Sequence, residues 1–178
     1  NGNYVRGIYE IDGVIYFFDP NTGALKREAG WRTWGNGRYF TNGEGIAYRN
    51  RFITFGVPKF YMGSDGAVQT GIFTVNNGRL YNADDRTGEI IQKAQWIEKN
   101  DKRYFSNSEG ELYKNQFISF GNTYYYMGAD GAVVVGSFYY NGESYTSNQE
   151  GIVNELNGPP GSRVLGIDVS YAQGAIDW

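Results

Sequence analysis

The sequence contains neither cysteine nor histidine among its 178 residues. Without cysteine there are no disulfides and no thiolate metal ligands in this chain. Without histidine there is no imidazole ligand, and no Ser–His or Cys–His catalytic pair can form within it. No apolar run approaches the roughly 20 residues that a membrane-spanning helix needs. These absences remove several classes of enzyme from consideration.

Positive charge is also scarce. The 16 Lys and Arg residues are outnumbered by 19 Asp and Glu residues, which gives a net charge of −3. Phosphate binding needs clustered basic side chains, and no such cluster stands out, so we expect neither a nucleic-acid nor a membrane partner. Asp65 and Asp130 lie in S-D-G and A-D-G turns without the spacing of a calcium loop, so no metal or other cofactor is expected. The oligomeric state is not indicated.

Glycine and aromatic residues are abundant instead. The chain has 26 Gly, 16 Tyr, 11 Phe and 4 Trp residues, whereas average glycine usage is about 7%. Each aromatic ring can bury roughly 150–250 Å². This composition predicts short strands, tight turns and a thin core made of rings.

The sequence repeats itself after 65 residues. The segment RYFTNGEGIAYRNRFITFGVPKFYMGSDGAV, which begins at Arg38, returns at Arg103 as RYFSNSEGELYKNQFISFGNTYYYMGADGAV. Between 31–73 and 96–138 roughly half of the positions are identical, without insertion or deletion. A fixed repeat of this kind is typical of arrays whose units bury their apolar faces by stacking on neighbours.

The repeat divides into shorter units of about 21 residues. In each, an aromatic strand, a polar turn that ends in glycine and a short second strand suggest a β-hairpin. A second turn signal, such as Asp12-Gly13 or Asn141-Gly142, precedes several aromatic strands. The glycines that end the polar turns are Gly23, Gly45, Gly66, Gly88, Gly110, Gly131 and Gly151.

We therefore predict an all-β fold, a solenoid of short β-hairpin repeats over residues 1–153. Because the best match lies three units away, about three hairpins are expected per superhelical turn; the alternative is an old three-unit duplication without geometric meaning. The first residues look like the tail of a preceding repeat, so we expect an excised or processed fragment. Residues 154–163 are predicted to be a linker, because Pro159-Pro160 is flanked by glycines.

The segment GIDVSYAQGAIDW at the end of the chain resembles the opening of the family-25 glycoside hydrolases, the bacterial and phage muramidases. The resemblance includes Gln173 and Asp177-Trp178, and it implies that Asp168 occupies a catalytic position at the end of the first strand of an α/β barrel. Residues 164–178 would then be the N-terminal stub of a truncated muramidase domain; the alternative is a chance strand end. Glycoside hydrolysis generally needs two carboxyl groups, so this chain alone is expected to be inactive even if its parent is a lysozyme.

The hairpin units resemble the cell-wall-binding repeats of Gram-positive surface proteins: choline-binding repeats, and the repeats of glucan-binding glucosyltransferases and clostridial toxins. YFFDPNTGAL (16–25) and RYFTNGEGIA (38–47) are closest to the latter two. The resemblance implies a secreted, cell-wall-associated module that anchors a secreted or phage-type peptidoglycan hydrolase. Its partner would be a cell-wall polymer, either a glycan or teichoic acid.

Choline recognition requires ring faces within about 6 Å of a quaternary ammonium. In choline-type repeats two aromatic residues seven positions apart help to build this cage. Here the residue seven positions after Phe52 is Lys59, and the residues seven positions after Trp31 and Trp96 are Arg38 and Arg103. A cation in place of the second ring disfavours choline at these three positions. Three slots keep two rings: Tyr9 with Tyr16, Phe117 with Tyr124, and Phe138 with Tyr145.

The same residues suit a glycan better, because sugar rings stack on aromatic faces while Arg, Asn and Asp bind their hydroxyls. Two similar stations one solenoid turn apart would add avidity. The alternatives are choline binding and a spacer that binds nothing. Many of the rings are expected to be core, with Phe17, Phe40, Phe105, Met62 and Met127 filling the spine. The predicted ligand-binding residues are Trp31, Trp34, Arg38, Tyr39, Trp96, Arg103, Tyr104, Phe117 and Tyr124.

Overall fold

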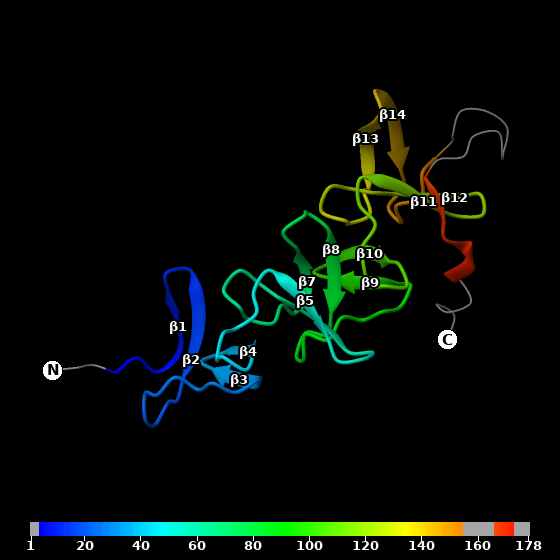
Figure 1. The fold of residues 1–178 in the computed structure, drawn as a ribbon. Helices are drawn as coiled ribbons and strands as arrows, with labels where there is room; N and C mark the ends of the chain where they lie inside the picture. Colours follow the sequence, from blue (N-terminus) through cyan, green and yellow to red (C-terminus); the bar gives the residue numbers. More distant parts are fainter. Residues whose placement is uncertain (1–3, 155–165, 173–178) are drawn as a thin grey trace. The chain divides into compact units, whose positions relative to one another are not determined.

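Fourteen of the strands form seven antiparallel β-hairpins, which confirms the prediction of an all-β array (Figure 1). The computed structural model describes residues 4–154 and 166–172. None of these residues belongs to a helix long and apolar enough to cross a membrane. The hairpins are β1 (Gly7–Ile11) with β2 (Val14–Phe18), β3 (Gly30–Trp34) with β4 (Gly37–Thr41), β5 (Arg51–Thr54) with β6 (Lys59–Met62), β7 (Gly71–Thr74) with β8 (Leu80–Ala83), β9 (Gln95–Lys99) with β10 (Lys102–Ser106), β11 (Gln116–Phe120) with β12 (Thr123–Met127), and β13 (Gly136–Tyr140) with β14 (Glu143–Ser147).

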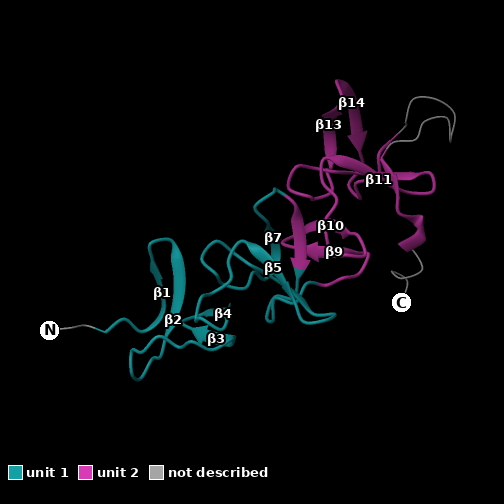
Figure 2. Cartoon of the chain, viewed as in Figure 1, with its two compact units in different colours: residues 1–78, 83–90 teal, residues 79–82, 91–178 magenta. Residues whose placement is uncertain are grey.

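The chain divides into two compact units (Figure 2). Unit 1 contains residues 1–78 and 83–90, and unit 2 contains residues 79–82 and 91–178. Each unit has its own aromatic core, described below.

Several hairpins close through two-residue loops in which both residues have positive φ. Asp12 and Gly13 have φ values of 50° and 81°, and Asn141 and Gly142 have 50° and 79°. This is the type I′ geometry, whose twist matches that of the flanking strands. The β9–β10 loop uses Asn100 for the same purpose, at φ 52°, without a glycine to reveal it.

The polar turns are also where the sequence predicts them, since all seven glycines that end them have positive φ, from 74° at Gly23 to 84° at Gly110. Their role differs from the prediction. They do not join the two strands of a hairpin; they follow the hairpin and lead into a short stretch that makes only isolated bridges, such as Thr41 with Ala47. The hairpins close instead at the second set of turns, through two-residue loops in most of them and through a longer loop between β7 and β8.

From the second polar turn onward, the stretch after the turn also bonds to an earlier hairpin, the one before the hairpin that the turn follows. In unit 1, for example, the N–H of Ala47 donates to the carbonyl of Ile15 at 2.8 Å. Neighbouring hairpins are therefore joined by backbone hydrogen bonds as well as by rings, as expected of an array with nearest-neighbour contacts. Three hairpins per superhelical turn stays a prediction. The equivalent bonds, all 2.8 Å, run from Val68 to Arg38, Ile90 to Lys59, Leu112 to Leu80, Val133 to Arg103 and Val153 to Tyr124.

The cores contain rings, aliphatic side chains such as Ile15 and Leu112, and two methionines. Met62, Met127 and Phe105 are fully buried and Phe17 is 6% exposed, as predicted, whereas Phe40 is only half-buried. Buried hydroxyls end some of the second strands: Ser106 donates to the carbonyl of Lys93 at 2.7 Å.

A short segment follows the repeats. Strand β15 (Ile167–Asp168) pairs in parallel with β11, and the 3-10 turn η1 (Ser170–Ala172) comes after it. Most of the predicted linker, 155–163, and the muramidase-like residues Gln173, Asp177 and Trp178 lie outside the described residues. No barrel domain is present among the residues described.

Candidate functional site

The pleat of the β3–β4 hairpin separates the predicted station into two faces. Trp31 pairs with Phe40 and Thr33 pairs with Arg38. Because side chains alternate along a strand, Trp31 and Arg38 share one face, while Trp34 and Tyr39 lie on the other. The prediction that these residues form one station is therefore wrong for Trp34 and Tyr39.

The β9–β10 hairpin repeats this arrangement. Trp96 pairs with Phe105 and Glu98 pairs with Arg103, so Trp96 and Arg103 share a face. Tyr104 lies on the opposite face, where it is 9% exposed. Tyr104 is thus separated from the ring that it was predicted to join.

Trp31 is held by three other rings in unit 1. Its ring centre lies 5.3 Å from that of Phe40, 5.2 Å from that of Phe60 and 5.7 Å from that of Phe55. The contacts with Phe40 and Phe60 are edge-to-face, and such pairs add about 0.5–1.5 kcal/mol each beyond area burial. We call Trp31, Arg38, Phe40, Phe55 and Phe60 the Trp31 station.

The Trp96 station has the same plan, 65 positions later, in unit 2. The ring centre of Trp96 lies 5.1 Å from that of Phe105, 5.7 Å from that of Phe120 and 5.0 Å from that of Tyr125. Together with Arg103 these residues define the station. The repeat in the sequence therefore produces the same arrangement of side chains once in each unit.

Each station carries its own cation. The Cζ atom of Arg38 lies 4.5 Å from the ring centre of Trp31, and that of Arg103 lies 5.1 Å from the ring centre of Trp96. Nη1 of Arg38 donates to the carbonyl of Thr87 at 2.9 Å, and Nη2 of Arg103 donates to the carbonyl of Glu150. A guanidinium held in this way covers the ring face that an external quaternary ammonium would need.

Lys59 acts similarly at Phe52, where its Nζ lies 4.4 Å from the ring centre. The sequence pattern that disfavours choline at these three positions therefore has a direct geometric counterpart. Protein cations already occupy these rings.

The other predicted residues have varied environments. A Cβ added to Gly7 would lie 2.1 Å from the indole of Trp34, so this ring rests directly on the β1 backbone; it remains 38% exposed. Burial raises the pKa of Tyr39, and the nearby charge of Asp65 adds to this effect. Tyr39 is thus a packed phenol beside the next polar turn.

Phe117 is fully buried, among the rings of Tyr126 at 5.0 Å and Tyr145 at 5.2 Å. It cannot contact a ligand without unfolding its surroundings, so its assignment as a ligand-binding residue is corrected to core. Tyr124 is only partly buried against the same cluster. Among the possible choline slots, Phe138 and Tyr145 are also buried, at 8% and 7% exposure.

Tyr9 and Tyr16 form the most accessible of these slots. They are direct cross-strand partners in β1–β2, and Tyr9 is 51% exposed.

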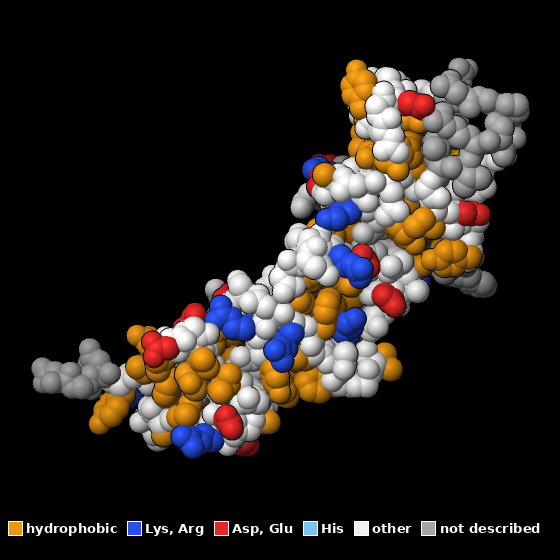
Figure 3. Space-filling view, turned by 45° about the horizontal axis from the view of Figure 1, so that its top comes forward, with side chains coloured by type: hydrophobic (Ala, Val, Ile, Leu, Met, Phe, Trp, Pro, Cys, Tyr) orange, Lys and Arg blue, Asp and Glu red, His pale blue; other side chains and the backbone are white. Residues whose placement is uncertain are grey.

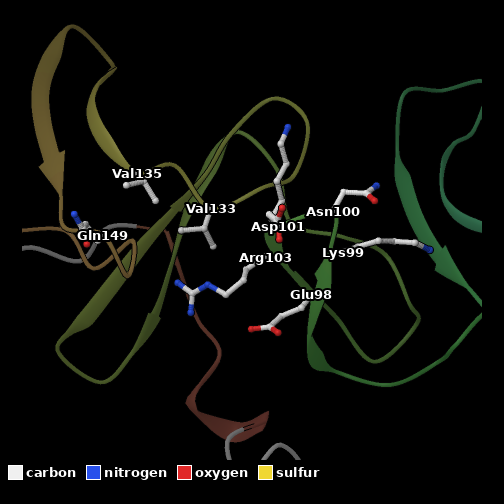
Figure 4. A pocket seen from close by; sticks show the side chains of 9 residues that line it. Glu98, Lys99, Asn100, Asp101, Arg103, Val133, Val135 and Gln149 are labelled. Carbon is white, nitrogen blue, oxygen red and sulfur yellow. The ribbon is translucent and has the colours of Figure 1, made fainter.

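A hollow of about 690 Å³ lies beside Arg103 in unit 2 (Figure 4). Arg103 and Glu98 extend toward the same open space, Val133 lies next to the arginine, and Lys99 points away. Charged, amide and apolar groups therefore meet at one place, a combination that can hydrogen-bond hydroxyls and pack against a sugar ring. Sequence reasoning missed this hollow, whose lining residues are Glu98, Lys99, Asn100, Asp101, Lys102, Arg103, Val133, Val135 and Gln149.

The surface has the mixed character that such a site requires. On the face shown in Figure 3, hydrophobic side chains reach the surface in several patches, with Lys and Arg among them and acidic side chains scattered between. No field of a single sign covers this face.

Asp168 lies on β15 next to Ser119 of β11. Its carboxylate accepts hydrogen bonds from the N–H of Ser170, at 2.9 Å, and from the hydroxyl of Ser170. These bonds hold the pKa of Asp168 below its ordinary value. Here Asp168 is an exposed capping group of a short turn, and its catalytic role stays a prediction.

Comparison with known proteins identifies relatives in sequence and in fold. No protein-family model matches the sequence. The chain is 35% identical to glucosyltransferase-S of Streptococcus mutans over 142 residues, which make up 77% of this chain but 9% of that protein. The chain thus spans a small part of the relative that it matches.

Among solved structures, CbpJ of Streptococcus pneumoniae is similar with a TM-score of 0.58 at 22% identity, over 86% of this chain and 55% of that one. Choline binding protein F of the same organism is similar with a TM-score of 0.57 at 23% identity, over 86% of this chain and 54% of that one. The chain shares their fold. At this level of identity the likeness says nothing about the ligand.

Proposed function

We propose that this chain is a binding module that holds a secreted protein on a bacterial surface polymer, and that the polymer is a glycan. The observation that carries the proposal is the hollow beside Arg103, where charged, amide and apolar side chains meet. Relatedness to a glucosyltransferase supports a glucan or similar polysaccharide as the ligand class.

The hollow beside Arg103 is the best candidate for the contact itself. Glu98 and Gln149 offer acceptors and donors for hydroxyls, and Val133 and Val135 offer an apolar wall. Val135 is 57% exposed, so this wall is available to a ligand. Such a site is weak on its own, and repetition along a polymer would raise the overall affinity.

The test is co-sedimentation of the isolated chain with insoluble α-glucan and with purified cell walls. The double variant Glu98→Ala with Gln149→Ala is expected to weaken binding at least about fivefold, since each lost hydrogen bond costs about 1 kcal/mol. The matched control is Glu44→Ala with Asn76→Ala, two exposed positions away from the hollow, and it should bind as the parent does. A chain that stays in the supernatant with every polymer would instead be a spacer.

Choline binding is the second candidate, because Tyr9 and Tyr16 keep two rings at the seven-residue spacing of choline-type repeats. Tyr9 and Tyr16 are the residues at which we would expect it, because that pair is accessible and free of a covering Lys or Arg in the contacts described. Millimolar choline that elutes the bound module, with loss of elution in Tyr9→Ala, would support teichoic acid as the ligand and contradict the glycan proposal.

We also propose that the module serves an attached enzyme. The muramidase-like residues around Asp168 favour a peptidoglycan hydrolase, whereas the similarity to a glucosyltransferase favours a polysaccharide-synthesising enzyme. Assays of the full-length parent for cell-wall lysis and for polysaccharide synthesis would separate the two. The resulting location would be outside the cell, at the wall.

A further inference from the structure

The outer edge of β11 is occupied by another segment of the chain. Strand β15 adds to it in parallel, with Ile167 beside Ile118 and Asp168 beside Ser119. The N–H of Val169 donates to the carbonyl of Ser119 at 2.8 Å.

Side chains complete this docking. The N–H of Gly121 donates to the hydroxyl of Ser170 at 2.8 Å. Val169 is fully buried and Ala172 is 2% exposed, both in the core cluster that contains Ile118. The contact is thus a strand addition with an apolar anchor on one side.

The same edge exists in unit 1, on β5. By the 65-residue repeat, the segment Ile53-Thr54-Phe55-Gly56 corresponds to Ile118-Ser119-Phe120-Gly121. Both hairpins close through a two-residue loop that begins with this glycine, at φ 74° for Gly56 and 63° for Gly121. The two edges therefore have the same backbone course.

Hydrogen-bonded and non-hydrogen-bonded pairs alternate along the hairpin, and this alternation directs the backbone N–H and C=O of Thr54 outward. The N–H of Phe55 donates to the carbonyl of Pro58 at 2.9 Å, which makes this the hydrogen-bonded pair next to the loop. The preceding pair, Thr54 with Lys59, is then a pair that does not exchange backbone bonds. The N–H and C=O of Thr54 consequently face the outer edge, as those of Ser119 do.

This edge is accessible where that of β11 is covered. Ser119 is 6% exposed and Ile118 fully buried, whereas Thr54 is exposed and Phe55 is 44% exposed. Unpaired strand edges with a neighbouring apolar side chain are templates for strand addition.

Charge distinguishes the two edges and indicates what would bind here. Lys59, the cross-strand partner of Thr54, takes the place of Tyr124 at the β11 edge. An added strand that places an Asp beside Thr54, as β15 does beside Ser119, would put its carboxylate on the face that carries this ammonium group.

We propose that the outer edge of β5, with Phe55 and Gly56, binds an extended acidic–apolar peptide segment of another protein by parallel strand addition. The segment carries the pattern apolar–Asp–apolar–Ser, the chemistry of residues 167–170. This inference does not depend on polymer binding.

The test uses the full chain and a capped synthetic peptide of sequence GIDVSYA, followed by amide NMR. The peptide is expected to shift the resonances of Thr54 and Gly56 in a saturable way. Thr54→Pro should weaken binding at least about tenfold, because proline removes the outward N–H while leaving the hairpin bonds intact. Thr54→Val keeps the N–H and should bind within about twofold of the parent.

A peptide with Asn in place of Asp provides a measurement that does not depend on a folded proline variant. It should bind about three- to tenfold more weakly, because it loses the attraction to Lys59. Equal binding of both peptides, or equal binding by Thr54→Pro, would overturn the proposal. So would shifts at Ser119 and Gly121 alone, which would mean that the peptide only displaces β15. Self-association of the chain that Thr54→Pro abolishes would assign the edge to a second copy and overturn the choice of a separate partner.

Discussion

The guanidinium group of Arg38 covers the indole ring of Trp31, with Cζ 4.5 Å from the ring centre. The same side chain donates to the carbonyl of Thr87, which lies in the third polar turn after Arg38. Arg38 therefore links a hairpin to a turn about 50 residues away in the sequence. Within unit 1 the guanidinium group thus makes the cation–π contact that a bound cationic ligand would otherwise make with Trp31.

Replacing Arg38 by Ala should lower the free energy of unfolding by about 1–2 kcal/mol, because a cation–π contact and a charge-assisted hydrogen bond are both lost. Equilibrium unfolding in urea measures this change. Arg27→Ala, at an exposed position, is the control and should stay within about 0.5 kcal/mol of the parent. Equal effects of both variants would mean that Arg38 contributes only general charge.

A glycine series should separate backbone strain from steric clash. A Cβ at Gly88, where φ is 75°, would lie 2.1 Å from Cγ1 of Val68, so Gly88→Ala is expected to cost at least about 3 kcal/mol. At Gly13, where φ is 81°, there is nothing within 4 Å, so Gly13→Ala should cost about 1–2 kcal/mol from the backbone alone.

Gly43 completes the series, since it has no positive φ and nothing within 4 Å of an added Cβ. Gly43→Ala should be neutral or stabilise by up to about 1 kcal/mol. Thermal unfolding of the three variants side by side gives the ranking. Any other order would mean that the turns are not held as described.

The buried hydroxyl of Ser106 should be worth more than its size suggests. Its removal in Ser106→Ala leaves the carbonyl of Lys93 without this donor, at a cost of about 1–3 kcal/mol. Ser108→Ala, in the exposed turn that follows, is the matched control with little expected effect. Hydrogen exchange of the β9–β10 amides would report the same loss locally.

Stability should fall in acid because of the polar turns. The N–H of Ala132 and the ammonium group of Lys102 hold the pKa of Asp130 below its ordinary value, and turn N–H groups do the same for Asp84. A lowered folded pKa gives stability that is complete above the unfolded pKa of about 3.9 and is lost as the pH falls through the folded value. Melting temperatures between pH 6 and pH 2 should therefore drop below about pH 4.

Asp130→Asn should flatten this acid limb, since the amide cannot titrate. Ser108→Ala, which alters an exposed side chain without a titratable group, should leave the limb unchanged. An acid limb that is the same in Asp130→Asn and the parent would contradict the assignment.

The positions of the polar turns could be read from the sequence, because glycine in a left-handed conformation leaves a clear signal at each of them. Whether a given turn closes a hairpin or follows one could not be read from the sequence. The sequence shows aromatic strands on both sides of two kinds of turn, and nothing in the local pattern shows which kind closes a hairpin. At 100–101 the loop uses Asn and Asp with positive φ, and no local pattern marks it.

The stations were predictable in part. The seven-residue spacing of Trp31 and Arg38 correctly brought the two side chains to one place, since pairing across a two-residue loop puts them on one face. Trp34 and Tyr39 were assigned to the same site because they are close in the sequence. Side chains alternate between the two faces of a strand, so these two lie on the opposite face. The hollow beside Arg103 depends on Gln149, which the chain brings in from a turn 46 positions away, and short-range pattern gives no sign of that.

The bonds that run from the post-turn stretches to earlier hairpins have a further consequence. Every new hairpin completes its predecessor through the same local geometry, so a copy of about 21 residues can be inserted or deleted without redesigning the contacts already made. Recombination within the coding sequence could thus lengthen or shorten the array in whole steps. The strength of attachment would then depend on the number of repeats that the gene encodes, and it could change without a new binding surface.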